Sequence, residues 1–262
     1  MDAITSLDKA IDLLEHLHEA GGARGITEIA TALGLPKSSA HRLLKTLVRR
    51  GFAEQEGSGR YRSGPALIAL GLGALDRDPM VALARPVLEA EAAALGETVF
   101  LTAARGRQIV VLDKAEGQGF LRAAPKVGQV VPVAATAVGR LALAFDPGRF
   151  AVADHPPGAF TAATQLASPA VQLAIERARS DGFAINRGEW IEGLSVVAAP
   201  IFRATEPPAL AGALAVAAPT ARLDALGAHS VAQRAVEAAR LISLRLAGRD
   251  PAWRRNSNGG TS

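Results

Sequence analysis

The stretch from Gly25 to Glu54, GITEIATALGLPKSSAHRLLKTLVRRGFAE, contains two helical segments joined by a tight turn. Thr27 predicts the start of the first helix, because its hydroxyl can cap a helix N-terminus, and Gly34 predicts its end. Leu35-Pro36 then forms the turn, and a longer helix begins near Lys37. A short helix, a tight turn and a longer helix are typical of a helix-turn-helix motif.

The longer helix has one apolar face and one face rich in hydrogen-bond donors. Consecutive helical residues are about 100° apart, which places Ala40, Leu43, Leu44, Leu47 and Val48 on one side and Ser38, Ser39, Arg42, Lys45, Thr46 and Arg49 on the other. The second face has no carboxylate. Arg and Lys side chains donate to guanine edges and neutralise phosphates, so this helix fits the major groove of DNA.

Positive charge is concentrated in the same region. The whole chain has a net charge of +4, but residues 1–36 carry −4 and residues 37–62 carry +5. After the longer helix, residues 52–55 and 60–63 flank a Gly-containing turn and predict a short hairpin, here called the wing. We therefore predict DNA contacts from the longer helix and the wing, by Lys37, Ser38, Ser39, His41, Arg42, Thr46 and Arg60.

Some of these residues have an equally simple alternative role. His41 lies at the edge of the apolar face, where it could pack against the domain core. Lys45, Arg49 and Arg50 fit simple solvent exposure. Arg60 and Arg62 of the wing are placed to meet the DNA backbone.

Shifts in composition divide the chain into four parts. They are a winged helix-turn-helix domain over 1–64, a helical linker over 65–95, a second domain over 96–248 and a disordered tail over 249–262. The first domain begins with an amphipathic helix over residues 6–20, capped by Ser6, and the linker holds helices over 66–75 and 81–95. In the second domain, strands are expected at 99–104, 109–115, 183–186, 195–202 and 209–217, and helices at 136–145, 168–180 and 223–247. The predicted class is α+β, with a sheet domain of interleaved strands and helices at the C-terminal end.

The composition excludes several kinds of chemistry. With no cysteine there is no disulfide, thiolate metal site or cysteine nucleophile. The remaining sequence has no metalloprotease, phosphate-loop or nucleophile-elbow motif, and its carboxylates are scattered, so we expect neither enzymatic activity nor a metal or cofactor. The acidic N-terminus is unlike a signal peptide, and the longest uncharged run, 155–175, contains three prolines. A cytoplasmic protein without membrane helices is expected.

The segment from Gly25 to Glu54 resembles the DNA-binding part of the IclR family of bacterial transcription regulators, through its Leu-Pro-Lys-Ser start and Arg-Leu-Leu-x-Thr-Leu core. The resemblance continues through VGQVVPVAATAVGRLALA, DGFAINRGEWIEGLSVVAAPIF and ALAGALAVAAPTARL, and so covers nearly the full length. It implies a GAF-like domain that binds a small metabolite, usually a carboxylate, and alters DNA binding by a homodimer or homotetramer. Dimerisation through the first domain and the linker helix is expected, because palindromic half-sites need paired recognition helices.

By its motifs, the resemblance also implies a set of residues that line the metabolite pocket: Phe120, Ala123, Val131, Ala137, Val138, Asn186, Leu194, Val196, Ala215 and Ala217. To these we add Thr136, which begins a helix whose free N–H groups and dipole favour an anion. Thr136 has an alternative role, in which it only caps the helix and the small residues after it only allow tight packing against the sheet. Within the implied pocket only Asn186 and Thr136 are polar, so we expect an apolar or aromatic acid as ligand in preference to glyoxylate or pyruvate.

Two other functions fit the same sequence. One is a metabolic enzyme fused to a DNA-binding domain, in which the second domain would convert the small molecule. The other is a constitutive DNA-binding oligomer that binds no ligand. The sequence leaves open whether regulation is repression or activation.

Overall fold

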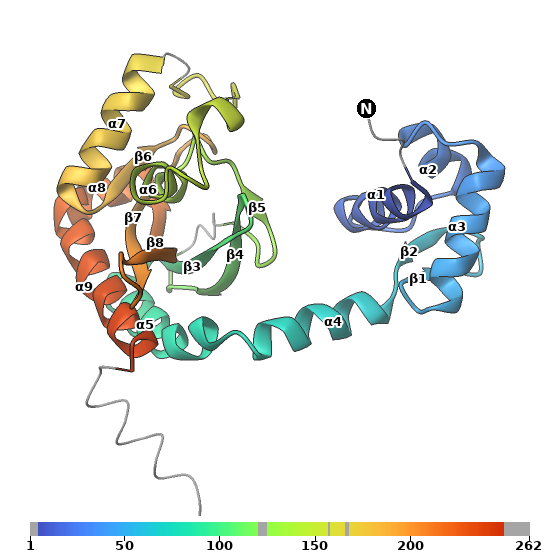
Figure 1. Cartoon of the computed structure of the whole chain (residues 1–262), viewed down its shortest axis with the longest axis horizontal. Coiled ribbons are helices and arrows are strands. Elements are labelled where there is room, and N and C mark those ends of the chain that lie inside the picture. The colour runs from blue at the N-terminus through green and yellow to red at the C-terminus, as the bar shows by residue number, and fades with distance from the viewer. Residues whose placement is uncertain (1–4, 120–124, 157, 166–167, 249–262) are drawn as a thin grey trace, which may run out of the picture. The chain divides into compact units, whose positions relative to one another are not determined.

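The computed structural model describes residues 5–119, 125–156, 158–165 and 168–248 (Figure 1). The chain divides between Arg77 and Asp78 into two compact units. The predicted pocket residues Phe120 and Ala123, and the predicted tail over 249–262, lie outside the described residues.

The first unit is a winged helix-turn-helix domain followed by one further helix. Its elements are α1 (Ser6–Glu19), α2 (Ile26–Ala32), α3 (Lys37–Arg49), β1 (Ala53–Gln55), β2 (Tyr61–Ser63) and α4 (Pro65–Asp76). The apolar faces predicted from periodicity form its core, which consists of Leu13, Leu17, Ile29, Leu44, Leu47, Ala53 and Tyr61. The predicted motif and wing are therefore confirmed, and α3 begins at Lys37 as expected.

Two helix caps differ from the prediction. Thr5, not Ser6, caps α1: the Asp8 amide donates to its Oγ1 at 3.2 Å, and its own amide donates to the Asp8 carboxylate at 2.7 Å. Thr5 Oγ1 also donates to the Asp8 carboxylate at 2.6 Å, and this hydrogen bond, together with the one from the Thr5 amide, holds the pKa of Asp8 below its ordinary value. The cap of α2 is Gly25, whose N–H donates to the Glu28 carboxylate at 3.3 Å. In both helices an acid three residues into the helix binds the N-cap amide, which decides where the helix begins.

The wing is a short antiparallel hairpin. Ala53 pairs with Ser63 and Gln55 with Tyr61, and Tyr61 also bridges to Arg24. Gly64 ends the hairpin where the chain passes so close to itself that an added Cβ would lie 2.3 Å from the Gly51 carbonyl oxygen. Only glycine fits there, so the join between the wing and α4 is set by the sequence.

The second unit is built on one six-stranded antiparallel sheet. The strands are β3 (Thr98–Arg105), β4 (Gln108–Ala115), β5 (Val130–Val131), β6 (Ala184–Arg187), β7 (Leu194–Arg203) and β8 (Ala209–Pro219), in the spatial order β5-β4-β3-β8-β7-β6. Helices α5 (Pro79–Leu95), α8 (Thr220–Leu226) and α9 (Ala228–Leu246) join helices α6 (Ala137–Phe145) and α7 (Ser168–Asp181), with a 3-10 turn over Val152–Asp154. This architecture confirms the predicted α+β class.

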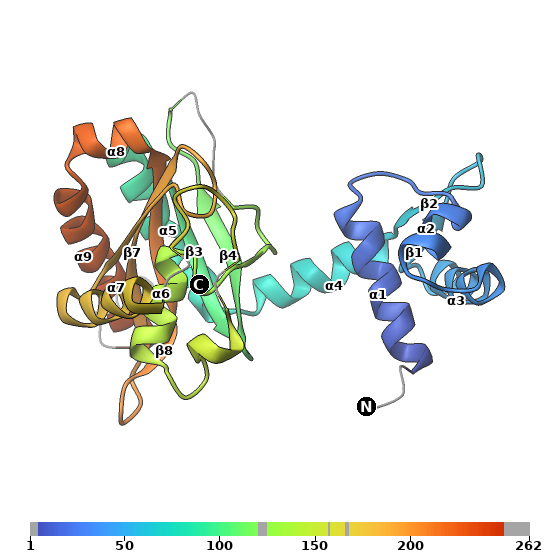
Figure 2. The ribbon, with the colours of Figure 1, turned by 90° about the horizontal axis from the view of Figure 1, so that it is seen from above.

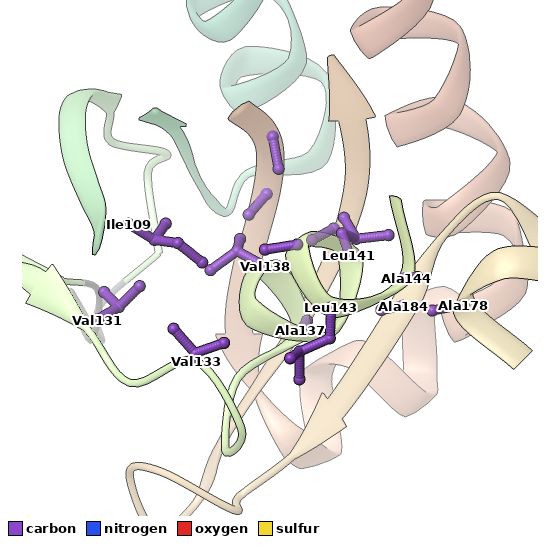
Figure 3. Packing of buried hydrophobic residues seen from close by; sticks show 14 of the residues in the cluster. Ile109, Val131, Val133, Ala137, Val138, Leu141, Leu143, Ala144, Ala178 and Ala184 are labelled. Carbon is purple, nitrogen blue, oxygen red and sulfur yellow. The ribbon is translucent and has the colours of Figure 1, made fainter. Parts of the chain in front are cut away.

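The helices cover both faces of the sheet. Helices α5 and α9 pack on each other and on the central strands, whereas α6 and α7 pack on each other and on β6, β7 and β8 (Figure 2). Because both faces are covered, β8 is buried along nearly its whole length. Ala213, Ala215 and Ala217 join the cluster around α6, where Val131, Ala137 and Val138 also lie (Figure 3).

Two predicted helices are placed differently in the structure. The helix predicted over 223–247 is divided into α8 and α9 at Gly227, whose φ of 79° lies in the left-handed region that favours glycine. The helix expected at the end of the linker, α5, is packed into the second unit, and buries Met80, Leu83 and Leu88. By contrast, α4 has no buried residue.

Candidate functional site

The outward face of α3 presents cations that have no partner within the domain. Lys37, Arg42 and Lys45 are exposed, and within the part of the chain that the structure describes no ion pair engages them. Helix α3 has no acid in its first turn and no side-chain cap, because its N-cap is Pro36. Its donors are therefore available to an anion, as binding to DNA phosphates requires.

The other predicted residues of α3 lie on or beside the same face. Ser38 and His41 are exposed and Ser39 is half-buried, so the alternative role of His41 as a core residue does not apply. Thr46 is exposed as well, although its hydroxyl donates to the Arg42 carbonyl oxygen at 3.1 Å. The helix therefore brings all six of its predicted contact residues to the solvent side.

Arg60 is placed differently from the prediction. Its Nη2 donates to the Ala23 carbonyl oxygen at 2.9 Å, and its Nη1 and Nη2 each lie 3.2 Å from the Glu28 carboxylate. Arg62 is likewise paired, with Glu54 at 2.8 Å. Arg62 therefore ties the wing to itself through its cross-strand neighbour Glu54, and Arg60 ties the wing to the start of α2 through Glu28, 32 residues away in sequence.

In the second unit, most of the predicted pocket residues meet around one small cavity of about 20 Å³. Its lining includes Val131, Thr136, Ala137, Val138, Asn186, Leu194 and Val196 from the prediction, together with Phe100, Pro125, Trp190 and Ile191, which the sequence reasoning missed. Phe100 and Pro125 lie outside the family motifs, whereas Trp190 and Ile191 lie within the motif segment over residues 181–202 but are not among the pocket residues that the resemblance implies.

Ala215 and Ala217 do not line this cavity. They lie on β8 in register with Phe100 and Val196 of the neighbouring strands, and all four side chains share one face of the sheet. The larger side chains of Phe100 and Val196 reach the cavity, whereas the alanine methyl groups are buried in the core.

The two polar side chains of the pocket are already hydrogen-bonded within the protein. Thr136 caps α6: its Oγ1 accepts from the Gly139 amide at 3.1 Å and donates to the Pro132 carbonyl oxygen at 2.6 Å. The Asn186 amide nitrogen donates to the Ala135 carbonyl oxygen at 2.5 Å. The capping role that was the alternative for Thr136 is therefore the one seen in the structure.

Two backbone donors at the same place have no partner. Ala137 and Val138 are the first residues of α6, they are 0% and 4% exposed, and among the described residues no hydrogen bond engages their N–H groups. Buried N–H groups are almost always paired in proteins. The α6 N-terminus thus offers two free donors and the positive end of the helix dipole to an otherwise apolar pocket.

This close approach depends on Gly139. An added Cβ there would lie 1.8 Å from the Val133 carbonyl oxygen, so the segment before α6 packs directly against the first turn of the helix. The small residues Ala137 and Gly139 therefore shape the pocket by letting the backbone approach closely.

A second and larger cavity, of about 630 Å³, lies between α7, β6 and the start of α9. Its charged lining includes Arg140, Arg177 and Arg187. Arg140 is ion-paired with Glu189, and Arg187 with Asp224 at 2.6 Å. Most of its positive charge is therefore already neutralised. The described residues contain no group of acidic and histidine side chains that could hold a metal ion.

A winged helix-turn-helix unit followed by a separate α+β domain is the arrangement of a DNA-binding regulator. Residues 6–57 match the family profile of the IclR helix-turn-helix domain, and residues 72–244 match that of the bacterial transcriptional regulator IclR C-terminal domain. The chain belongs to the IclR family of transcriptional regulators. It has the DNA-binding motif and the C-terminal effector domain of that family.

Named relatives and solved structures agree with this assignment. The glycerol operon regulatory protein of Streptomyces griseus is 33% identical over 86% of this chain and 89% of its own length. The acetate operon repressor of Salmonella typhimurium is 26% identical over 94% of this chain and 91% of its own length. An IclR regulator from Alicyclobacillus acidocaldarius superposes with a TM-score of 0.79 at 29% identity, covering 95% of this chain and 99% of that chain.

One structural neighbour was solved with a ligand. It is an IclR homologue from Microbacterium hydrocarbonoxydans in complex with 4-hydroxybenzoate, with a TM-score of 0.78, 21% identity and coverage of 93% of this chain and 100% of that chain. At this identity the likeness concerns the fold. Within the described parts of the present chain, no helix is both long enough and apolar enough to span a membrane.

Proposed function

We propose that this protein is a ligand-responsive regulator in which α3 binds operator DNA and a small organic acid binds at the α6 N-terminus and changes operator affinity. The observation that carries the ligand part is the pair of buried, unpartnered N–H groups of Ala137 and Val138. These donors suit a carboxylate, and the apolar lining from Phe100, Val131 and Leu194 suits an apolar or aromatic body.

The pocket in this structure is too small to hold an aromatic acid. A ligand site of this kind holds on the order of a few hundred Å³, whereas this cavity has about 20 Å³. An aromatic acid therefore enters only when the lining residues move apart. Of the lining residues, Pro125, Trp190 and Ile191 lie outside helices and strands, the last two on the short connection between β6 and β7. The 4-hydroxybenzoate complex of the structural neighbour supports an aromatic acid as the ligand class.

On the DNA side, we assign the contacts to α3. Lys37, Ser38, Ser39, His41, Arg42 and Thr46 face away from the domain core, and the cations among them are unpaired. A phosphate contact by Arg60 would have to displace Glu28, so Arg60 is the weaker candidate.

We also propose a homo-oligomer held by α4. This helix buries none of its residues within the chain, and Ile68, Leu70 and Leu72 are 64%, 61% and 57% exposed. An apolar helix of this kind is stable in water only when another surface covers it. A second copy of the same helix fits the paired half-sites that helix-turn-helix proteins bind.

The oligomer proposal is tested by light scattering after size-exclusion chromatography. Leu72→Glu should shift the protein toward the monomer, because it places a charge on the covered face. Leu173→Glu is the matched control, since Leu173 is 47% exposed on α7 in the second unit. An unchanged mass for Leu72→Glu would refute α4 as the contact surface.

The ligand proposal is tested with benzoate, 4-hydroxybenzoate, glyoxylate and pyruvate. The aromatic acids should raise the melting temperature and change the affinity for labelled operator DNA, and the two oxo acids should not. Tight binding of glyoxylate without binding of benzoates would refute the ligand class. Chemical conversion of the bound acid would instead favour the enzyme alternative, and no response to any acid would favour the constitutive oligomer.

A further inference from the structure

A buried ion pair joins α6 to the connection between β6 and β7. Arg140 is 3% exposed and Glu189 is 5% exposed, and the guanidinium Nη2 contacts the Glu189 carboxylate. The Nη1 of the same guanidinium donates to the Ile185 carbonyl oxygen at 2.9 Å. One side chain from α6 therefore holds both the edge strand β6 and the segment that follows it.

The segment at Gly188 and Glu189 is also held from two other directions. The Glu189 amide donates to Asn186 Oδ1 at 3.3 Å, and Asn186 in turn donates to the residue before Thr136. Thr164 Oγ1 donates to the Glu189 carbonyl oxygen at 2.6 Å. Thr161 Oγ1 donates to the Gly188 carbonyl oxygen at 2.7 Å. Hydrogen bonds therefore hold the backbone of Glu189, and the ion pair with Arg140 holds its side chain.

The next two residues of the chain, Trp190 and Ile191, line the small pocket. Arg140 and Glu189 line the larger cavity. The segment from Glu189 to Ile191 therefore lines both cavities, and the ion pair holds its first residue. The ion pair starts from the helix whose N-terminal amides, three and two residues earlier, are the free donors of the pocket.

Core packing alone does not account for this ion pair. Burying two charges costs desolvation energy, and a well-packed apolar pair of similar volume stabilises a fold equally well or better. A guanidinium offers what an apolar side chain does not, a planar set of donors that binds two acceptors at fixed positions. Here those acceptors are Ile185 and Glu189, one on each side of the turn into the pocket wall.

We infer that Arg140 is a positioning residue that, through Glu189, fixes Trp190 and Ile191 as the wall of the ligand pocket relative to the α6 N-terminus. This inference rests on the proposed function for its biological meaning, but the positioning itself can be measured without ligand. When a ligand carboxylate binds the α6 amides, the same helix transmits its position to the wall through the ion pair.

The test uses three variants. The first is a double variant that carries both Arg140→Met and Glu189→Met, the second is the single variant Arg140→Lys, and the third is the control Asp224→Asn. The double variant removes both charges at similar volume, so it should fold with a melting temperature at or above the wild-type value. Asp224→Asn removes the ion pair between Asp224 and Arg187 of β6. This pair is exposed, since the side chains of Arg187 and Asp224 are 48% and 54% exposed. All variants carry Trp253→Phe, so that Trp190 is the remaining tryptophan.

Two readouts on the ligand-free protein report the wall directly. Amide hydrogen exchange over residues 188–193 and acrylamide quenching of Trp190 should both increase in the double variant, the exchange by on the order of tenfold. Arg140→Lys should give a partial increase, because one ammonium cannot bind both acceptors at once. Asp224→Asn should match the parent protein in both readouts.

Unchanged exchange and quenching in a folded double variant would overturn the inference. If the double variant does not fold, Arg140→Lys provides the test. Unchanged exchange and unchanged quenching in Arg140→Lys would then overturn the inference. A wall that loosens while 4-hydroxybenzoate binds neither parent nor variant would leave the positioning role intact and count against the proposed ligand. Binding of 4-hydroxybenzoate that weakens in proportion to the loosening supports both.

Discussion

The side-chain amide of Asn186 on β6 donates to the carbonyl oxygen of Ala135 at 2.5 Å, across 51 residues of sequence. Asn186 is 3% exposed, and its other amide atom accepts from the Glu189 backbone. One buried side chain therefore links the segment before α6 to the segment that carries the pocket wall.

Replacement of this amide should destabilise the second unit. Asn186→Ala leaves the Ala135 carbonyl and the Glu189 amide without partners, and a buried polar group that loses its hydrogen bond costs about 1–3 kcal/mol. The free energy of unfolding from urea titration measures the loss. Thr205→Ala is the control, because the two hydrogen bonds it removes, to the Pro207 carbonyl oxygen and from the Ala209 amide, are exposed to solvent and should cost little. Equal stability of the two variants would contradict the prediction.

Gly139→Ala should damage both the fold and the pocket. The new Cβ would lie 1.8 Å from the Val133 carbonyl oxygen, so the α6 N-terminus must shift. Overpacking of this kind typically costs about 1–3 kcal/mol. Gly148→Ala is the matched control, since nothing lies within 4 Å of its added Cβ. Calorimetric melting of both variants measures the difference, and similar melting temperatures would show that the backbone at Gly139 has room to adapt.

Arg42→Ala should weaken operator binding and leave stability nearly unchanged. Arg42 is exposed on α3 and makes no ion pair with the described residues. Loss of a base contact costs about 1–3 kcal/mol of binding free energy, and loss of a phosphate contact lowers the salt slope by about 1. Fluorescence anisotropy over a range of salt concentrations separates the two. Wild-type affinity at every salt concentration would remove Arg42 from the interface.

Arg60→Ala should show the opposite pattern. Its guanidinium binds the Ala23 carbonyl and Glu28, and the side chain is 40% exposed, so solvent screens the ion pair. We expect the free energy of unfolding to fall by about 1 kcal/mol, mostly from the hydrogen bonds to Ala23. Operator affinity should change less than in Arg42→Ala. A larger affinity loss than that of Arg42→Ala would restore Arg60 as a direct DNA contact.

Asp113→Asn should change how stability depends on pH. Burial raises the pKa of Asp113 above its ordinary value, Arg85 and the Lys114 amide oppose this rise, and Glu89 adds to it. An acid with a raised pKa in the folded state contributes stability that is fully present below its unfolded pKa and is lost as pH rises through the folded pKa. Relative to the wild type, the variant should therefore gain stability as pH rises from the unfolded pKa, about 3.9, through the raised folded pKa of Asp113. Urea unfolding across this range measures the difference, and a constant difference would contradict the prediction.

The two functional surfaces differed in how far the sequence could predict them. On α3 the contact face follows from helical periodicity alone, because residues three and four apart share a face whatever surrounds the helix. In the pocket, family motifs pointed to Thr136, Asn186 and Val196. Phe100 lies outside the motifs and Trp190 is not a pocket position that the resemblance implies, and only the sheet register and the turn after β6 bring them to the cavity.

By itself, the sequence determined the helices, the turn and the wing of the DNA-binding unit, and the class of the second unit. Periodicity and glycines such as Gly34 and Gly64 act within a few residues of the chain, so they can be read locally. Only the tertiary structure decided that Arg60 is bound to Glu28 and that Arg140 is buried against Glu189, 49 residues further along the chain. The physical reason is that the partner of a charged side chain depends on which distant segment folds beside it, and that information is spread over the whole chain.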